Sequence, residues 1–198
     1  EIIGTSREEI LALSVRLPKW ILYTEITASD HFAEEAVAFR RADFEHDAAI
    51  LGVSVTDTLA GIESSAIATR MRSAPGLADL KIGLTNPDVF CLTQIDRISE
   101  QLAAVDPDIY SKSAIYIQPL AHGVNAHLQL TLHAPESEAR LLAQRAVNVA
   151  ETLDSRQGFF SRPYHPWAHI PFRRDQKITK YLKKTKFLFD AKGILQPA

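Results

Sequence analysis

The chain has 198 residues, 46% of them hydrophobic, which suffices for one sizeable domain with a packed core. Its net charge of -2 argues against a dedicated nucleic-acid-binding protein, whose basic surface would dominate the domain. A single cysteine, Cys91, excludes an internal disulfide and a cysteine-rich zinc site and is compatible with a reducing compartment. We therefore expect a cytoplasmic protein. We expect no membrane span, because no apolar run reaches the roughly 18 residues that a spanning helix needs.

The first 80 residues predict one strand and two helices. Residues 19–28 are rich in β-branched and aromatic side chains, which favour a strand. Residues 29–52 predict a helix that ends at Gly52. Residues 56–76 predict a second helix, although Gly61 lies inside it.

The next elements in chain order are three strands and a short helix. Residues 88–95 predict a buried strand, and residues 97–105 predict the helix after it. Residues 113–119 and 125–133 predict two strands that a short loop joins as an antiparallel hairpin.

The second strand of that hairpin alternates between apolar and polar residues. Because strand side chains point to opposite faces in turn, one face of this strand is expected in the core and the other is expected to be polar. The expected core face carries Ala126, Leu128, Leu130 and Leu132, and the polar face carries His127, Gln129, Thr131 and His133. The first strand repeats the pattern, with Ile115 and Ile117 opposite Tyr116 and Gln118.

Two further helices complete the chain. Residues 135–156 predict a helix with an apolar stripe of Leu142, Ala146, Val149 and Leu153. Residues 174–190 predict a lysine-rich amphipathic helix. This order of elements indicates an α+β fold, with helices on one face of a mainly antiparallel sheet.

Two segments carry side chains suited to chemistry. His122, Asn125 and His127 could meet a metal or a substrate oxygen at the entrance to a strand, or they could simply form a solvated sheet edge. The loop 158–174 is stiffened by three prolines. Within it, Arg162 is suited to bind an anion, Tyr164 and His165 to transfer a proton, and Trp167 to form an aromatic wall. A rigid connector that only packs on the domain explains the loop equally well.

The end of the chain resembles flavin-linked oxidases of the vanillyl-alcohol oxidase type. These enzymes finish with a lysine-rich helix and a phrase similar to Phe-Asp-Pro-x-Gly-Ile-Leu-Asn-Pro-Gly. The residues that match are Phe189, Asp190, Gly193, Ile194, Leu195 and Pro197, and those that depart are Ala191, Gln196 and Ala198.

A second resemblance lies in the hairpin and the loop that follows. Asn125 and His127 match a Gly-Asp-Gly-Asn-x-His phrase of the D-lactate and 2-hydroxyacid dehydrogenase branch. Gly158 and His165 match a later Gly-Gly-x-x-x-x-Glu-His-Gly loop, in which Tyr164 replaces the glutamate. Because that glutamate and the histidines hold a divalent metal in the branch, its loss predicts no metal here.

The resemblance implies a ferredoxin-like cap domain, spanning 1–198, of an FAD-dependent oxidoreductase that oxidises an alcohol, a 2-hydroxy acid or a phenol. Arg162, Tyr164 and His165 are the expected catalytic residues. The residues expected to face the FAD cofactor are Tyr116, Gln118, Asn125, His127 and Gln129.

The expected partners are an FAD-binding domain or subunit and a small-molecule substrate, with self-association left open. No glycine-rich phosphate loop occurs in the chain, which argues against binding of the FAD pyrophosphate by this chain alone. The start at Glu1 suggests a piece of a longer flavoenzyme or a separate subunit. The alternative is a noncatalytic ligand-binding or subunit-interaction module with the same fold. A third and weaker hypothesis is that the final lysine-rich helix binds nucleic acid.

Overall fold

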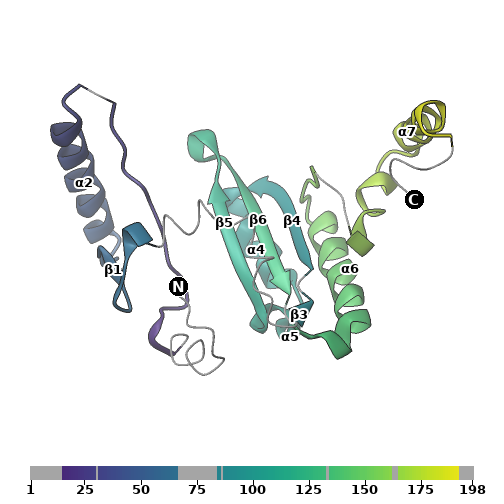
Figure 1. Cartoon of the computed structure of the whole chain (residues 1–198), viewed down its shortest axis with the longest axis horizontal. Coiled ribbons are helices and arrows are strands. Elements are labelled where there is room, and N and C mark those ends of the chain that lie inside the picture. The colour runs from purple at the N-terminus through teal and green to yellow at the C-terminus, as the bar shows by residue number, and fades with distance from the viewer. Residues whose placement is uncertain are drawn as a thin grey trace. The chain divides into compact units, whose positions relative to one another are not determined.

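The computed structural model separates into two compact units, Glu1–Asp79 and Leu80–Ala198, each with its own elements (Figure 1). The residues that it describes are 15–29, 31–66, 84–85, 87–132, 134–161 and 165–191.

The first unit contains the helix α2 (Ala33–Ile50), which confirms the helix predicted at 29–52. Glu34 and Glu35 occupy its first turn, where negative charge favours the helix N-terminus. Among its residues only Ala48 is buried, so the helix contributes little to a core within the described part of this unit.

The strand predicted at 19–28 is wrong, because residues 20–29 form no regular secondary structure. High β-propensity reflects packing on a sheet rather than an intrinsic preference of the backbone. The only described sheet of this unit is the two-residue pairing of β1 (Thr58–Leu59) with β2 (Ile62–Glu63), so residues 20–29 have no described strand beside them.

The helix predicted at 56–76 is wrong at its start, where β1 and β2 form an antiparallel hairpin instead. Ala60 and Gly61 form the turn with φ angles of 52° and 87°. Type I′ hairpin turns need positive φ at both central residues, and glycine adopts positive φ without steric cost. The glycine inside the predicted helix therefore marked the turn. Residues 67–76 of this prediction lie outside the described residues.

The second unit is built on an antiparallel sheet of β4 (Asp88–Gln94), β5 (Ser113–Pro119) and β6 (Asn125–Leu132). The strand order is β4-β6-β5, so β6 is central (Figure 1). All three strands were predicted from the sequence and are confirmed. A second small pairing joins β3 (Leu84–Thr85) to β7 (Ala134–Pro135).

One face of this sheet supplies the core. Val89 and Cys91 on β4, and Leu128 and Leu130 on β6, are fully buried. They join residues of the helices in a single buried cluster. The alternation predicted for β6 is therefore confirmed on its apolar side.

Three helices contribute to the same cluster: α4 (Ile98–Ala104), α5 (Pro107–Ser111) and α6 (Ala139–Ser155). The predicted stripe of α6 is buried as expected. Gln101 of α4 donates a hydrogen bond of 2.9 Å to the backbone oxygen of Arg156, which ties α4 to the end of α6. Short 3₁₀ helices lie at Ile95–Arg97, Ala121–Gly123, Glu136–Glu138, His165–Trp167 and Pro171–Arg173.

After α6 the chain returns to the outer edge of β4. Phe159 exchanges two backbone hydrogen bonds of 2.8 Å with Leu92, which makes an antiparallel bridge. Gly158 lies so close to the core that a Cβ atom there would stand 2.9 Å from the Sγ atom of Cys91 and from the oxygen of Leu153. Only glycine fits this approach without displacement of its neighbours.

The last element is α7 (Gln176–Phe189), which confirms the helix predicted at 174–190. Asp175 caps it by accepting hydrogen bonds from the backbone amides of Lys177 and Ile178. The fold is thus a mixture of helices and antiparallel sheet, as an α+β fold requires. Among the described residues, no helix is long and apolar enough to cross a membrane.

Candidate functional site

The candidate site is the face of the three-stranded sheet that lies opposite Val89, Cys91, Leu128 and Leu130, and we call it the polar sheet face; Phe90 lies on it and also belongs to the buried cluster. Residues paired across antiparallel strands point to the same side, so the register defines this face. Its members are Asp88, Phe90, Leu92 and Gln94 on β4, Ala114, Tyr116 and Gln118 on β5, and Asn125, His127, Gln129 and Thr131 on β6.

Three rings gather at the middle of the polar sheet face. The His127 imidazole stacks on Phe90, with 5.2 Å between ring centroids and 23° between planes. Tyr116 approaches the same imidazole edge-on, with a centroid distance of 6.2 Å. Because His127 is held between two aromatic neighbours and is only half-buried, its orientation is fixed while its ring remains partly accessible.

A chain of hydrogen bonds runs from His127 along β6. The Nε2 atom of His127 lies 3.3 Å from Oε1 of Gln129. The amide of Gln129 donates to Oγ1 of Thr131 over 3.4 Å, and that hydroxyl donates to Oδ1 of Asp88 over 2.6 Å. This series of hydrogen bonds ends on the Asp88 carboxylate, which accepts the strongest of them.

The donor-to-acceptor direction of these hydrogen bonds determines which ring nitrogen of a neutral His127 carries the proton. Because Gln129 donates to Thr131 through its amide nitrogen, its amide oxygen faces His127 as an acceptor. A neutral His127 then carries its proton on Nε2. Its Nδ1 atom keeps a lone pair, which can accept a proton from a hydroxyl group of a ligand.

The structure brings together three of the five residues predicted to face the cofactor, namely Tyr116, His127 and Gln129. Gln118 is paired with His127 across the sheet and is exposed. Asn125 is exposed at the start of β6, where it pairs with Gln94. A hollow of about 300 Å³, which Gln94 lines together with the loop before β6, lies at this end of the face.

The structure gives no side-chain contacts for the three predicted catalytic residues. Arg162 and Tyr164 lie outside the described residues, and His165 is described only as the first backbone position of a 3₁₀ helix. The described residues on either side are both attached to β4. Phe159 pairs with Leu92, and the indole nitrogen of Trp167 donates to the backbone oxygen of Asp88 over 3.2 Å.

Trp167 is a core residue and not the aromatic wall that the sequence suggested. Its side chain is fully buried between Phe90, at a centroid distance of 6.0 Å, and Phe160, at 5.0 Å. Further along the loop, Arg174 donates 2.8 Å hydrogen bonds to the Asp154 carboxylate and the Gly158 backbone oxygen. The second half of the loop is therefore a structural connector.

Three residues that take part in the ring contacts or the hydrogen-bond chain of the site were not among those predicted: Asp88, Phe90 and Thr131. Thr131 was placed on the polar side of its strand, but its contact with Asp88 joins residues 43 positions apart. The signal that could have found Asp88 and Phe90 is the alternation of β4. Both residues lie opposite Val89 and Cys91, whose burial identifies the core face.

The donor set of the polar sheet face fits one part of FAD. Imidazole, amide and phenol groups can hydrogen-bond the polar edge of an isoalloxazine ring, and aromatic side chains can pack on its plane. None of the eleven residues of the polar sheet face is a lysine or an arginine, so this face provides no side-chain cation for the pyrophosphate. Within the described part of the chain, no group of three or more histidine, cysteine, aspartate or glutamate residues is placed to hold a metal ion.

No family model, curated protein or solved structure matches the chain. The likeness to flavin-linked oxidases therefore depends on the sequence phrases given above.

Proposed function

We propose that this chain is the substrate-binding cap of an FAD-dependent oxidoreductase that acts on an alcohol, a 2-hydroxy acid or a phenol. The flavin accepts the hydride in such an enzyme, and the protein binds and orients the substrate. The observation that carries the proposal is the hydrogen-bond chain from His127 to Asp88, on the polar sheet face.

His127 is the residue with the clearest role in this proposal. An alcohol or 2-hydroxy acid whose hydroxyl group contacts Nδ1 of His127 would transfer its hydroxyl proton there as the hydride leaves the carbon that bears this hydroxyl for the flavin; a 4-alkylphenol would transfer its phenol proton there as the hydride leaves its alkyl carbon. Positive charge then develops on the imidazole, and the chain through Gln129 to the Asp88 carboxylate stabilises it. Tyr116 and Phe90 hold the ring in the position in which Nε2 contacts Gln129.

Arg162, Tyr164 and His165 remain candidate catalytic residues. In the proposal Arg162 binds the carboxylate or phenolate of the substrate, and Tyr164 and His165 assist deprotonation. Support comes from the attachment of the flanking residues Phe159 and Trp167 to β4, the strand that carries Phe90.

The ferredoxin-like form of the fold is also part of the proposal. The second unit runs strand, helix, strand, strand, helix, and then Phe159 bridges to β4. With Phe159 counted as a short fourth strand, the order across the sheet is fourth, first, third, second, with neighbours antiparallel. This order supports a ferredoxin-like sheet. The pyrophosphate of FAD would be bound by a separate FAD-binding domain or subunit.

The test uses the intact protein that contains this chain, purified together with its FAD-binding domain or subunit. We expect oxidised-flavin absorbance that is lost under anaerobic conditions when a 2-hydroxy acid or a 4-alkylphenol is added. His127→Ala should slow this loss about 10²-fold or more, because a positioned general base contributes that much. Gln129→Ala should slow it less and should shift its dependence on pH, since Gln129 acts through His127.

The matched control is His46→Ala, which removes an exposed histidine of the first unit and should leave the rate unchanged. A protein that binds no flavin, or a His127→Ala variant with the wild-type rate, contradicts the proposal. Tyr164→Phe and His165→Ala variants that keep the wild-type kcat/KM would remove the loop from catalysis. A purified protein that binds a hydroxy acid without flavin would instead favour the noncatalytic module.

A further inference from the structure

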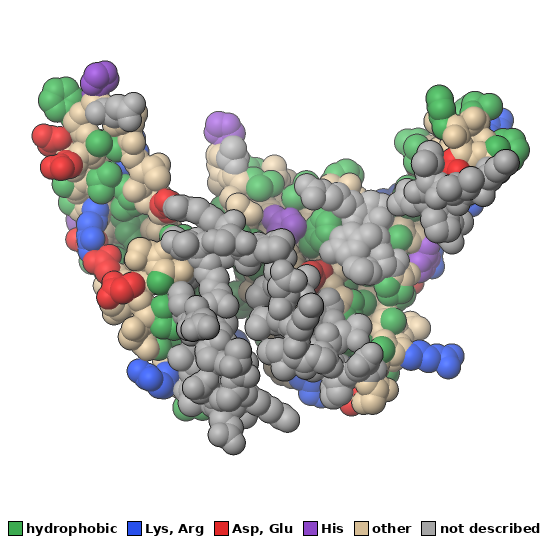
Figure 2. All heavy atoms as spheres, viewed as in Figure 1, with side chains coloured by type: hydrophobic (Ala, Val, Ile, Leu, Met, Phe, Trp, Pro, Cys, Tyr) green, Lys and Arg blue, Asp and Glu red, His purple; other side chains and the backbone are tan. Residues whose placement is uncertain are grey.

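The helix α7 is amphipathic, but its apolar side is exposed. With about 100° of rotation per residue, five of its six large apolar side chains form one stripe along the helix. The stripe consists of Ile178, Tyr181, Leu182, Leu188 and Phe189, and we call it the apolar stripe of α7. Between 50% and 81% of the surface of each of these side chains is exposed. Figure 2 shows hydrophobic side chains gathered on the surface over α7.

The remainder of the helix is cationic. It contains five lysines and no acidic residue: Lys177, Lys180, Lys183, Lys184 and Lys186. None of the first four forms an ion pair with a described residue. By helical rotation, Lys177 and Lys184 border the apolar stripe on one side and Lys186 borders it on the other.

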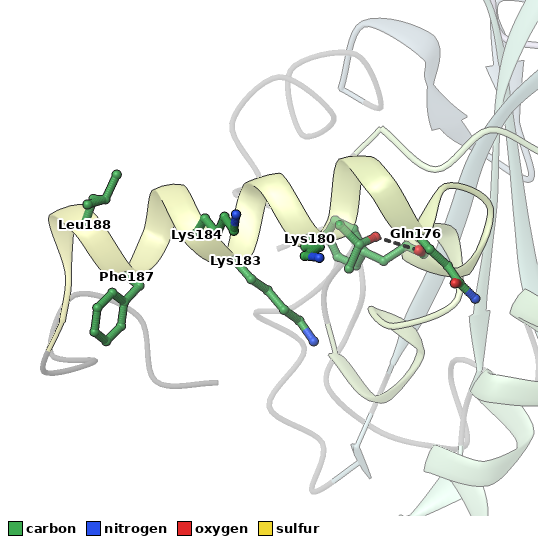
Figure 3. Close-up of a pocket in the computed structure, with 8 residues that line it drawn as sticks. Gln176, Lys180, Lys183, Lys184, Phe187 and Leu188 are labelled. Carbon is green, nitrogen blue, oxygen red and sulfur yellow. Dashed lines mark hydrogen bonds between the residues drawn. The ribbon is translucent and has the colours of Figure 1, made fainter.

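The lysine side of α7 is hollowed. An open groove of about 730 Å³ runs along it, and its lining includes Lys180, Lys183 and Lys184 together with Phe172 and Phe187. In Figure 3, Lys183 and Phe187 extend from the same side of the helix, and Leu188 extends from the opposite side. Phe187 is thus the one large apolar residue among the lysines.

The attachment of α7 leaves most of its surface uncovered. The helix packs on the preceding 3₁₀ helix Pro171–Arg173, to which Thr179 donates a 2.7 Å hydrogen bond at the oxygen of Phe172. No residue of α7 is buried. An apolar side and a cationic side are therefore available to the same binding partner.

We propose that α7 binds the surface of an anionic lipid bilayer, with its apolar stripe among the acyl chains and the lysines that border the stripe at the lipid phosphates. The pattern of charge is the argument for lipid. Lysines on both borders of the apolar stripe can reach up to headgroups on either side, which an extended anionic surface satisfies along all 14 residues. A groove in an acidic protein would need an apolar floor for the stripe and acidic residues along both sides of it, all held in one fixed shape. This inference is independent of the proposed oxidoreductase activity.

The test is flotation of the purified full chain with vesicles of phosphatidylcholine, with or without about 30% phosphatidylglycerol, because anionic lipid supplies the attraction. We expect binding to the anionic vesicles only, with a loss at high salt. Lys177→Glu combined with Lys184→Glu, the two lysines on one border of the apolar stripe, should weaken binding by about thirtyfold or more, since each cation near an anionic surface contributes on the order of a fivefold change in affinity. Leu182→Asp combined with Phe189→Asp should abolish binding even at low salt.

The charge-matched control is Lys112→Glu combined with Arg140→Glu, which changes the net charge equally at exposed sites away from α7. This variant should bind anionic vesicles within about threefold of wild type, and circular dichroism should show that every variant is folded. Absence of vesicle binding, equal binding to neutral vesicles, or equal loss in the control overturns the proposal. Retention on polyglutamate or on DNA without vesicle binding also overturns it, in favour of an acidic protein or a nucleic acid.

Discussion

The two tryptophans of the chain lie in contrasting environments, one in each unit. Trp167 in the second unit is fully buried, contacts two phenylalanine rings and donates a hydrogen bond to β4. Trp20 in the first unit is half exposed and lies in a segment without regular secondary structure. Both are large aromatic residues, so the difference reflects what the surrounding chain provides.

The second unit surrounds its tryptophan with a sheet and helices that share one buried cluster. In the first unit, Ala48 is the only buried hydrophobic residue that the structure describes, and several polar contacts lie at the surface. Arg41, for example, forms ion pairs of 2.7 Å with Glu45 and 2.9 Å with Asp57, all of them exposed. Stability should therefore reside in the second unit, since exposed ion pairs contribute little.

The largest expected effect comes from removal of Trp167. Trp167→Ala should lower the free energy of unfolding by about 3–5 kcal/mol, because it removes a buried indole and leaves a cavity. Urea unfolding followed by circular dichroism measures this change. Trp20→Ala is the counterpart and should change stability by no more than about 0.5 kcal/mol. Equal losses for the two variants would contradict the contrast between the units.

A smaller loss is expected at Gly158. Gly158→Ala should cost about 1–3 kcal/mol, because the added Cβ would stand 2.9 Å from the Cys91 Sγ atom and the Leu153 oxygen. The matched change is Gly52→Ala, where no atom lies near the position of the new Cβ but φ is positive. Urea midpoints compare the two. A Gly158→Ala protein as stable as wild type would show that β4 and α6 can separate at little cost.

The dependence of stability on pH provides a third test of the buried core. Burial raises the pKa of the Cys91 thiol from an ordinary value of 9.0 to about 12. Between these values the unfolded chain releases the thiol proton and the folded chain retains it, so stability falls as pH rises. At pH 10 this cysteine should cost about 1.4 kcal/mol relative to pH 8. Cys91→Ala, compared with wild type at both pH values, isolates the effect from other groups.

The smallest effects should come from two arginines. Arg174→Ala removes hydrogen bonds to Asp154 and Gly158 and should cost about 1 kcal/mol. Arg41→Ala removes two exposed ion pairs in the first unit and should leave the urea midpoint unchanged. A larger loss for Arg41 than for Arg174 would place more stability in the first unit than the structure indicates.

The same contrast explains which elements could be predicted from sequence. The alternation at β6 and the stripe of α6 are local patterns that report directly on burial, and both predictions are confirmed. Residues 20–29 have the composition of a strand but no described neighbour to pair with. The start of the helix predicted at 56–76 fails at Ala60 and Gly61, where the turn conformation overrides helix propensity.

The residues of the candidate site could also be predicted from the sequence only in part. His127 and Gln129 could be placed on one face because they lie two residues apart in one strand. Their link to Asp88 could not be predicted, since it depends on the register between β4 and β6. That register pairs two segments that lie far apart in the sequence, which no local pattern encodes.

The hydrogen bond from Trp167 to the backbone of β4 also affects how this protein can meet other chains. Together with Phe159, the indole occupies backbone groups on the outer edge of β4, where a foreign strand would otherwise dock. The opposite edge of the sheet, β5, is paired with β6 on one side and with no described strand on the other. Among the described edges of this three-stranded sheet, Ser113–Pro119 is therefore the more open to an added strand, and Pro119, which lacks an amide hydrogen, limits how far such pairing can extend.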